Sequence, residues 1–294
     1  MSHAIFIGIA KHIDAFRDTL DSKTHLLENA GIKIRIQEQA SGRFVIFSCS
    51  GGDTGLDPLC LSLLAAAVAD LIISRWEKVM LFNITKTGYP FLKEDERRCV
   101  YELALARMEH PDGEHGQLTM ARRKRLVQTR LEEFLLSSSH LNVDGFVVFR
   151  LKDYLADLRW VVGRAVEDFL LEREYREFIS LLRFFLENQR PRAVTVHVVV
   201  RPPGRFQLYD HDFRPVSYQY MDGLIVDVNH SEIDYEDILI SALITIAPVK
   251  VVLHAPGPVC LTPHTLTTLQ AVFQDKVAQC PGCRFCMGTD KAGR

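Results

Sequence analysis

The sequence lacks the features that would identify several common classes of protein. Its formal net charge is only -2 over 294 residues, so overall charge predicts no special attraction to nucleic acid or to an acidic membrane surface. It contains no Gly-x-Ser-x-Gly elbow, no His-Glu-x-x-His pair and no protein-kinase signature. The sequence therefore carries no motif that identifies an enzyme.

The sequence also lacks a long run of apolar residues. The most apolar stretch, residues 59–74, is shorter than the roughly 20 residues that a membrane span requires, and it contains Asp70. The first residues form no basic leader, and their apolar run stops at Lys11. We therefore expect a cytoplasmic protein without a membrane span, in which residues 59–74 form a buried helix.

The first 190 residues show a pattern typical of helices with a small sheet. A short apolar run at residues 4–9 predicts a strand, and alternating apolar and polar residues at 32–49 predict a β-hairpin. Apolar residues at helical spacing predict further helices at 11–29, 57–82, 92–109 and 118–137. The stretch 145–189 contains only Gly163 as a breaker, so it predicts one amphipathic helix or two helices end to end.

The composition changes at Pro191, where predicted strands begin to alternate with predicted helices. The expected strands are 193–200, 206–209, 224–228 and 249–253. One helix should begin after Ser231 or Asp234 and reach residue 246. A last helix to residue 273 should have Thr262 as its N-cap and Pro263 at its first position.

These patterns together predict an α+β protein with two domains and a tail. Residues 1–190 should form a mostly helical domain that contains the hairpin sheet. Residues 191–279 should form a small α/β domain, and residues 280–294 a cysteine-rich tail.

The clearest candidate site is a group of cysteines near the C-terminus. Cys280, Cys283 and Cys286 follow a Cys-x-x-Cys-x-x-Cys spacing, with Pro-Gly in the first turn. Such a turn brings two thiolates within reach of one metal ion, and zinc takes four ligands of this kind. We therefore predict a structural zinc site, with Cys260, or else His264 on the last helix, as the fourth ligand.

Other functions of these cysteines remain open. A [4Fe–4S] cluster would need a fourth cysteine close behind the third, and Asp290 stands there instead. A redox dithiol usually lies between a strand and a helix, and a tail that binds no ion is a third alternative. The isolated Cys49, Cys60 and Cys99 indicate ordinary reduced thiols of a cytosolic protein.

Four consecutive basic residues lie near the start of the helix predicted at 118–137. They are Arg122, Arg123, Lys124 and Arg125. They could contact phosphate and, together with the cysteine turn, would suit a regulator that binds nucleic acid. No aromatic residue interleaves them, so a platform for stacking bases is absent, and a solvent-exposed helix face explains the run equally well.

A second polar cluster, Asp210, His211 and Asp212, lies beside a predicted strand. An enzyme would need a pocket between the two domains that joins this cluster to the region of Arg150. The sequence shows no partner that would complete a catalytic dyad there. An enzyme of this kind is therefore the alternative to a non-enzymatic protein.

One segment resembles a known family. Residues 142–154, Asn-Val-Asp-Gly-Phe-Val-Val-Phe-Arg-Leu-Lys-Asp-Tyr, followed by residues 169–179, resemble the YtxC-like family of sporulation proteins from endospore-forming bacteria. The run at 243–248 and the terminal cysteines fit the same resemblance. It implies a cytoplasmic protein linked to sporulation, without an assigned reaction or catalytic residues. We therefore predict a protein that acts through contacts with protein partners and has a zinc ion at its C-terminal cysteines.

Overall fold

The apolar patterns near the N-terminus pair into one sheet. Its strands in the computed structural model are β1 (Ile5–Ile9), β2 (Arg35–Ser41), β3 (Phe44–Ser50) and β4 (His140–Asn142). Their order is β2-β3-β1-β4, with β4 parallel to β1 and the other neighbours antiparallel. Gly42 takes a φ of 60° in the hairpin turn, which glycine adopts without strain. Alternate residues of β1 are buried, so one face of this sheet points into the core.

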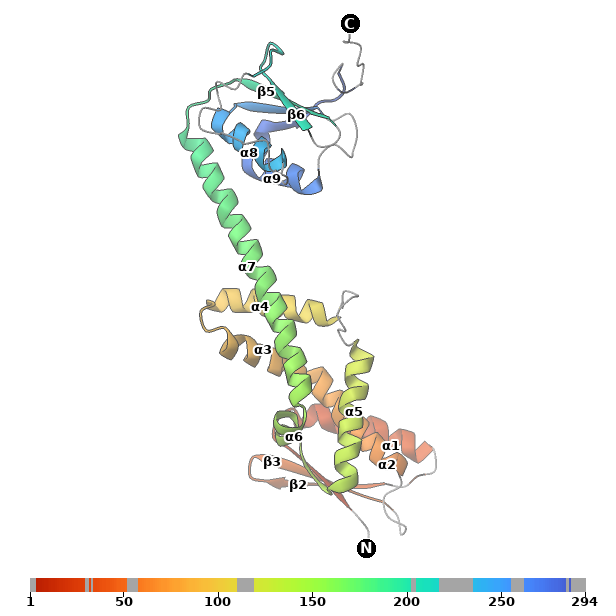
Figure 1. Ribbon diagram of the computed structural model, residues 1–294. Coiled ribbons are helices and arrows are strands. Elements are labelled where there is room, and N and C mark those ends of the chain that lie inside the picture. Colours follow the sequence, from red (N-terminus) through yellow and green to blue (C-terminus); the bar gives the residue numbers. More distant parts are fainter. Residues whose placement is uncertain are drawn as a thin grey trace. The chain divides into compact units, whose positions relative to one another are not determined.

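Two compact units divide the chain, Met1–Leu170 and Leu171–Arg294. The structure describes residues 4–29, 32, 34–51, 58–109, 119–201, 205–216, 235–254, 262–283 and 286. Within these residues each unit combines helices with a four-stranded sheet (Figure 1). The predicted α+β class is therefore confirmed.

Helices supply most of the first unit. They are α1 (Ile13–Asn29), α2 (Pro58–Leu71), α3 (Glu77–Gly88), α4 (Glu94–Glu109), α5 (Met120–Ser137), α6 (Val143–Arg150) and the first part of α7 (Lys152–Asn188). A π-helical turn at Ile72–Trp76 joins α2 to α3, where the sequence predicts one uninterrupted helix. The long helical stretch is two helices end to end, α6 and α7, one of the two arrangements that the sequence predicts.

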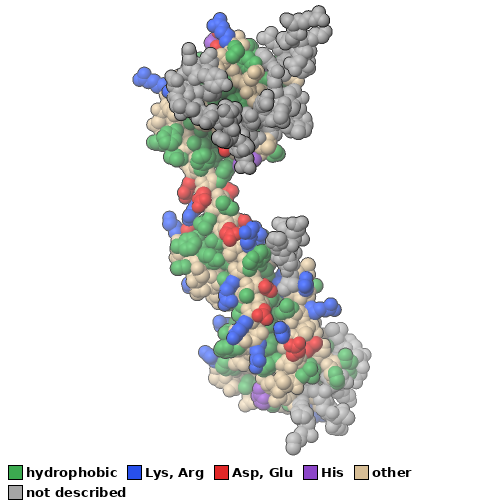
Figure 2. Space-filling model, viewed as in Figure 1, with side chains coloured by type: hydrophobic (Ala, Val, Ile, Leu, Met, Phe, Trp, Pro, Cys, Tyr) green, Lys and Arg blue, Asp and Glu red, His purple; other side chains and the backbone are tan. Residues whose placement is uncertain are grey.

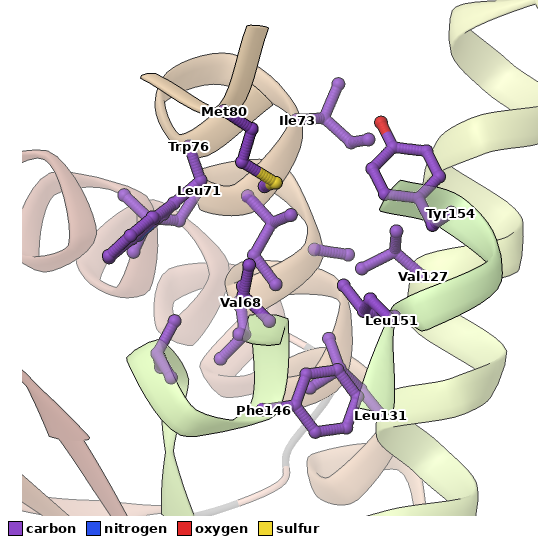
Figure 3. Packing of buried hydrophobic residues seen from close by; sticks show 14 of the residues in the cluster. Val68, Leu71, Ile73, Trp76, Met80, Val127, Leu131, Phe146, Leu151 and Tyr154 are labelled. Carbon is purple, nitrogen blue, oxygen red and sulfur yellow. The ribbon is translucent and has the colours of Figure 1, made fainter. Parts of the chain in front are cut away.

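The helix α2 lies in the core of the first unit. Figure 3 shows Val68 and Leu71 of α2 in one apolar cluster with Val127 and Leu131 of α5, in which Tyr154 of α7 lies near Val127. The continuous helical run Pro58–Gly88 is 31 residues long and apolar enough to cross a membrane, but 56% of its most apolar window is buried inside the protein. Core helices meet the same criterion, and the burial agrees with the expected core helix.

The second unit is an α/β unit, as predicted. Its strands β5 (Thr195–Arg201), β6 (Arg205–Tyr209), β7 (Lys250–His254) and β8 (Val277–Gln279) have the order β6-β5-β7-β8. Strands β5, β7 and β8 are parallel, and β6 is antiparallel at one edge. Among the described residues, its helices are the second part of α7, α8 (Tyr235–Ile246) and α9 (Pro263–Phe273), and a short 3₁₀ turn follows at Gln274–Lys276. The strand predicted at 224–228 lies outside the described residues.

One face of this second sheet packs against helices. Buried side chains of α8 and α9 pack with Val196, Val198 and Val200 of β5. Because side chains alternate along a strand, His197 and Val199 point to the opposite face.

The N-cap of α9 is Thr262, whose side chain accepts a hydrogen bond from the backbone N–H of Thr265, so this predicted cap is confirmed.

The helix α7 contributes to both cores. Its Phe169 belongs to the core of the first unit, whereas Ile179 and Leu186 belong to the core of the second. The compact units therefore divide inside this helix, after Leu170. The boundary predicted near residue 190 follows the change in composition and assigns the whole helix to the first domain.

Candidate metal centre

Four side chains that can bind a metal ion lie together at one edge of the second sheet. They are His254, Cys280, Cys283 and Cys286, and their ligand atoms all lie within 4.8 Å of one another. His254 is the last residue of β7, and Cys280 directly follows β8. The imidazole is almost fully buried, and the three cysteines are half-buried.

The pairing of two parallel strands brings these residues together. In the register of β7 and β8, Leu253 pairs with Gln279, so His254 and Cys280 are the next residues on neighbouring strands. The backbone N–H of Cys280 continues this pairing by donating to the carbonyl oxygen of Leu253 at 2.9 Å. The carboxyl ends of parallel strands meet at one edge of a sheet, which is where sites commonly form in α/β folds.

The remaining two cysteines are placed by a tight turn. Gly282 takes a φ of 130°, which side chains larger than hydrogen rarely allow. The backbone N–H of Cys286 then donates to the carbonyl oxygen of Cys283 at 2.9 Å. The Pro-Gly pair lies in the turn from Cys280 to Cys283, and the sulfur atoms of Cys283 and Cys286 lie 3.9 Å apart.

The distances fit a tetrahedral zinc ion. With Zn–S near 2.3 Å and Zn–N near 2.05 Å, a tetrahedral site has sulfur atoms about 3.8 Å apart and nitrogen about 3.6 Å from sulfur. The Cys283 and Cys286 sulfurs are 3.9 Å apart, and His254 Nδ1 lies 3.2 Å from Cys283 Sγ and 3.6 Å from Cys286 Sγ. A small cation fits among these atoms without a large movement of the backbone.

The protonation of the cluster sets the condition under which it can bind a cation. Burial raises the pKa of the Cys286 thiol to about 11, so the thiol keeps its proton at neutral pH unless a positive charge lies next to it. Burial lowers the pKa of His254, which keeps its imidazole neutral and able to coordinate a metal. Three thiols and one imidazole form a ligand set typical of structural zinc, whereas ferredoxin-type [4Fe–4S] clusters use four thiolates.

Comparison with known proteins gives the family. The sequence pattern of the YtxC-like family matches residues 62–278, which is most of the chain. The chain belongs to the YtxC-like family. A curated relative, the uncharacterized protein YtxC of Bacillus subtilis (strain 168), is 29% identical to this YtxC-like protein over 208 residues, 68% of this chain and 70% of the relative. No solved structure matches.

The family match bears on the metal centre in one respect. It includes His254 but ends before Cys280, the first of the three clustered cysteines. The proposal of a metal site in this YtxC-like protein therefore depends on the geometry of the four side chains.

Among the described residues the fourth member of the cluster is His254, where the sequence suggests Cys260 or His264. Cys260 lies outside the described residues. His264 lies on α9, where its ring is 6.0 Å from the ring of Tyr175, and it is not among the four clustered side chains. His254 was missed, although its position directly after the strand predicted at 249–253 is a signal that sequence reasoning can use.

The run of basic residues does not form one patch. Arg123 is buried, its Nε donates to Glu77 Oε1 at 2.8 Å, and Lys124 forms an ion pair with Asp70. Only Arg122 and Arg125 are exposed. Successive residues of a helix are rotated by about 100°, so four consecutive side chains point in four directions. On the face shown in Figure 2, basic and acidic side chains of the first unit are interspersed.

The cluster Asp210, His211 and Asp212 lies in a turn after β6. It could also hold a cation by proximity, but His211 and Asp212 are exposed. Asp210 Oδ1 accepts hydrogen bonds from the backbone N–H groups of Asp212 and Arg214, each at 2.9 Å. These bonds explain the aspartate as a turn residue.

Proposed function

We propose that this YtxC-like protein binds one structural zinc ion through His254, Cys280, Cys283 and Cys286. The convergence of the four ligand atoms within 4.8 Å is the observation that carries the proposal. Four protein ligands would complete the tetrahedral coordination of zinc and leave no position for a substrate. A structural role is therefore better supported than a catalytic one.

The position of the four residues indicates what the ion would stabilise. It would join the end of β7 to the segment that follows β8, a strand of only three residues. A strand this short gains little from its own backbone pairing, so a covalent-like link beside it would hold the sheet edge in place. Zinc would therefore contribute mainly to the folding free energy of the second unit.

The zinc content of purified protein tests the proposal. Protein purified without chelators should contain about one zinc ion per chain by mass spectrometry, and Cys283→Ser should lose most of it. Cys99→Ser is the matched control, because Cys99 is exposed on α4 and lies outside the cluster. Zinc far below one equivalent in the natural protein, or full zinc content in Cys283→Ser, would contradict the proposal.

We further propose that the protein acts in the cytoplasm during sporulation, through contacts with protein partners. The family resemblance suggests this role, and the buried free thiols Cys49 and Cys60 are compatible with a reducing compartment. Two neighbouring apolar side chains on α6, Val148 and Phe149, are 55% and 69% exposed and would suit a partner surface.

Complementation of a deletion strain tests this second part. In an endospore-forming bacterium that lacks the gene, the natural protein should restore the yield of heat-resistant spores. The double variant Val148→Ser with Phe149→Ser should restore less, because it loses the exposed apolar surface. Phe91→Ser is the control, since Phe91 is 63% exposed elsewhere in the first unit. Normal spore yield in the deletion strain would count against a sporulation role.

A further inference from the structure

A second histidine lies directly behind the candidate metal centre. His197 on β5 faces the same side of the sheet as His254, and its Nδ1 lies 2.9 Å from His254 Nε2. The two rings have centroids 5.1 Å apart. His254 therefore uses both ring nitrogens, with Nδ1 toward the cysteine sulfurs and Nε2 toward His197.

The position of protons follows from this arrangement. A neutral imidazole carries one proton, and the nitrogen that binds a metal must be free of it. If His254 binds the ion through Nδ1, its proton lies on Nε2, which then donates to Nδ1 of His197. His197 must in turn be neutral, with its own proton on Nε2. Outer partners of this kind commonly fix the tautomer and orientation of a metal-binding histidine.

An aromatic ring holds His197 from its other side. The ring of Phe213 stacks on His197 with centroids 4.3 Å apart and an angle of 24° between the ring planes. Phe213 has a φ of 60°, an unfavourable conformation for a bulky residue. Its backbone N–H donates to the carbonyl oxygen of Asp210 at 3.0 Å, and Tyr209 pairs with Pro215 across the turn. Strained residues persist where surrounding contacts require them, which here places the ring on His197.

We propose that His197 is a positioning residue for the metal centre, which fixes His254 in the tautomer that presents Nδ1 to the ion, and that Phe213 holds His197 in place. This inference rests on the proposed zinc site. It adds an outer layer to the four ligands, supplied by β5 and by the turn at residues 210–215.

Zinc affinity in a set of variants tests the inference. Competition with a coloured chelator should show zinc binding weakened by about 10- to 100-fold in His197→Ala. His197→Asn should recover most of the loss, because its side-chain oxygen can accept a hydrogen bond where Nδ1 of His197 does. Phe213→Leu should weaken binding less than His197→Ala. His25→Ala on α1, an exposed histidine outside both metal-capable clusters, is the control and should bind zinc normally.

A spectroscopic measurement separates positioning from a merely structural role. Long-range ¹H–¹⁵N correlation of the zinc-bound protein should show His254 protonated on Nε2 and coordinated through Nδ1. The cobalt-substituted protein should show altered absorption bands in His197→Ala and nearly natural bands in His197→Asn. Should His197→Ala fail to fold, the Asn and Leu variants and the tautomer measurement still decide the question.

The outcomes distinguish this inference from the zinc site itself. A natural protein that binds no zinc would overturn the proposed function, and this inference with it. A natural protein that binds zinc, together with a His197→Ala variant of equal affinity, would overturn this inference alone. Coordination of His254 through Nε2 would also overturn it, because His197 then could not accept the proton.

Discussion

Replacing Glu77 with glutamine should strongly destabilise the first unit. Glu77 on α3 and Arg123 on α5 are 7% and 6% exposed, and they form two hydrogen bonds, Nε to Oε1 at 2.8 Å and Nη2 to Oε2 at 3.3 Å. The hydroxyl of the fully buried Tyr154 on α7 donates to the same Oε1. Burial raises the pKa of Tyr154, so its hydroxyl remains a donor at neutral pH. Three helices therefore meet at one carboxylate.

The size of the effect follows from the charge that the substitution leaves behind. Glutamine keeps nearly the same shape, so packing changes little, but the buried guanidinium of Arg123 loses the negative charge of Glu77. Breaking a buried ion pair from one side typically costs about 3–5 kcal/mol. Arg123 also donates to the carbonyl oxygen of Met108 at 3.1 Å, which satisfies one N–H but not the charge. We expect a loss of about 3 kcal/mol, the lower end of this range.

Tryptophan fluorescence during urea unfolding measures this loss in the first unit alone. The chain has two tryptophans, Trp76 and Trp160, and both lie in the first unit. Because Trp76 is next to Glu77, the unfolding midpoints are compared and not the signal amplitudes. Glu133→Gln is the control, since its pair with Arg130 is exposed and should be worth less than about 1 kcal/mol.

A double variant tests whether the lost stability comes from the buried charge. Glu77→Gln with Arg123→Met removes both charges and should regain part of the stability, because no charge is then buried at this site. The glutamine oxygen can still accept the hydrogen bond from Tyr154. A loss below about 1 kcal/mol in Glu77→Gln would refute the reasoning. Equal stabilities of the single and double variants would do the same, because the cost would not then come from the lost pairing of Arg123 with Glu77.

Three further changes have expected outcomes. Removing zinc with a chelator should lower the thermal stability of the second unit, followed by circular dichroism, and leave the tryptophan transition of the first unit unchanged. Gly163→Ala in α7 should raise the stability of the first unit by about 0.5–1 kcal/mol in urea unfolding, because a Cβ there meets only Tyr89 Oη, at 3.4 Å. Thr262→Ala should cost the second unit about 1 kcal/mol in calorimetry, because α9 loses its N-cap.

The elements that the sequence predicted correctly are determined by residues within or next to those elements. The hairpin of β2 and β3 follows from alternation around a Gly turn, and the start of α9 follows from Thr262 and Pro263. The strands β4 and β8 were missed because three residues are too few for a periodic pattern. Their positions are determined by pairing with β1 and β7, distant in sequence. The π-helical turn at Ile72–Trp76 likewise has no signal in the apolar spacing.

The basic run shows how a local pattern can mislead. Arg122 to Arg125 are adjacent in sequence, and the nearest acidic residue on their own helix is Glu132. The counter-charges of Arg123 and Lys124 come from Glu77 and Asp70, on helices that precede α5 by many residues. Charge along one segment therefore could not show which of the four cations is buried, since tertiary packing supplies the partners.

The metal centre likewise combines three ligands that are close in sequence with one that is distant in sequence. Cys280, Cys283 and Cys286 share one turn, so their spacing was enough to predict that they converge. His254 joins them only because β7 and β8 are parallel neighbours in the register that pairs Leu253 with Gln279. A shift of that register by two residues would move the imidazole by about 6.6 Å, beyond the reach of a zinc–ligand bond. The fourth ligand thus depends on the pairing of a three-residue strand, and a bound ion would in turn hold that pairing in register.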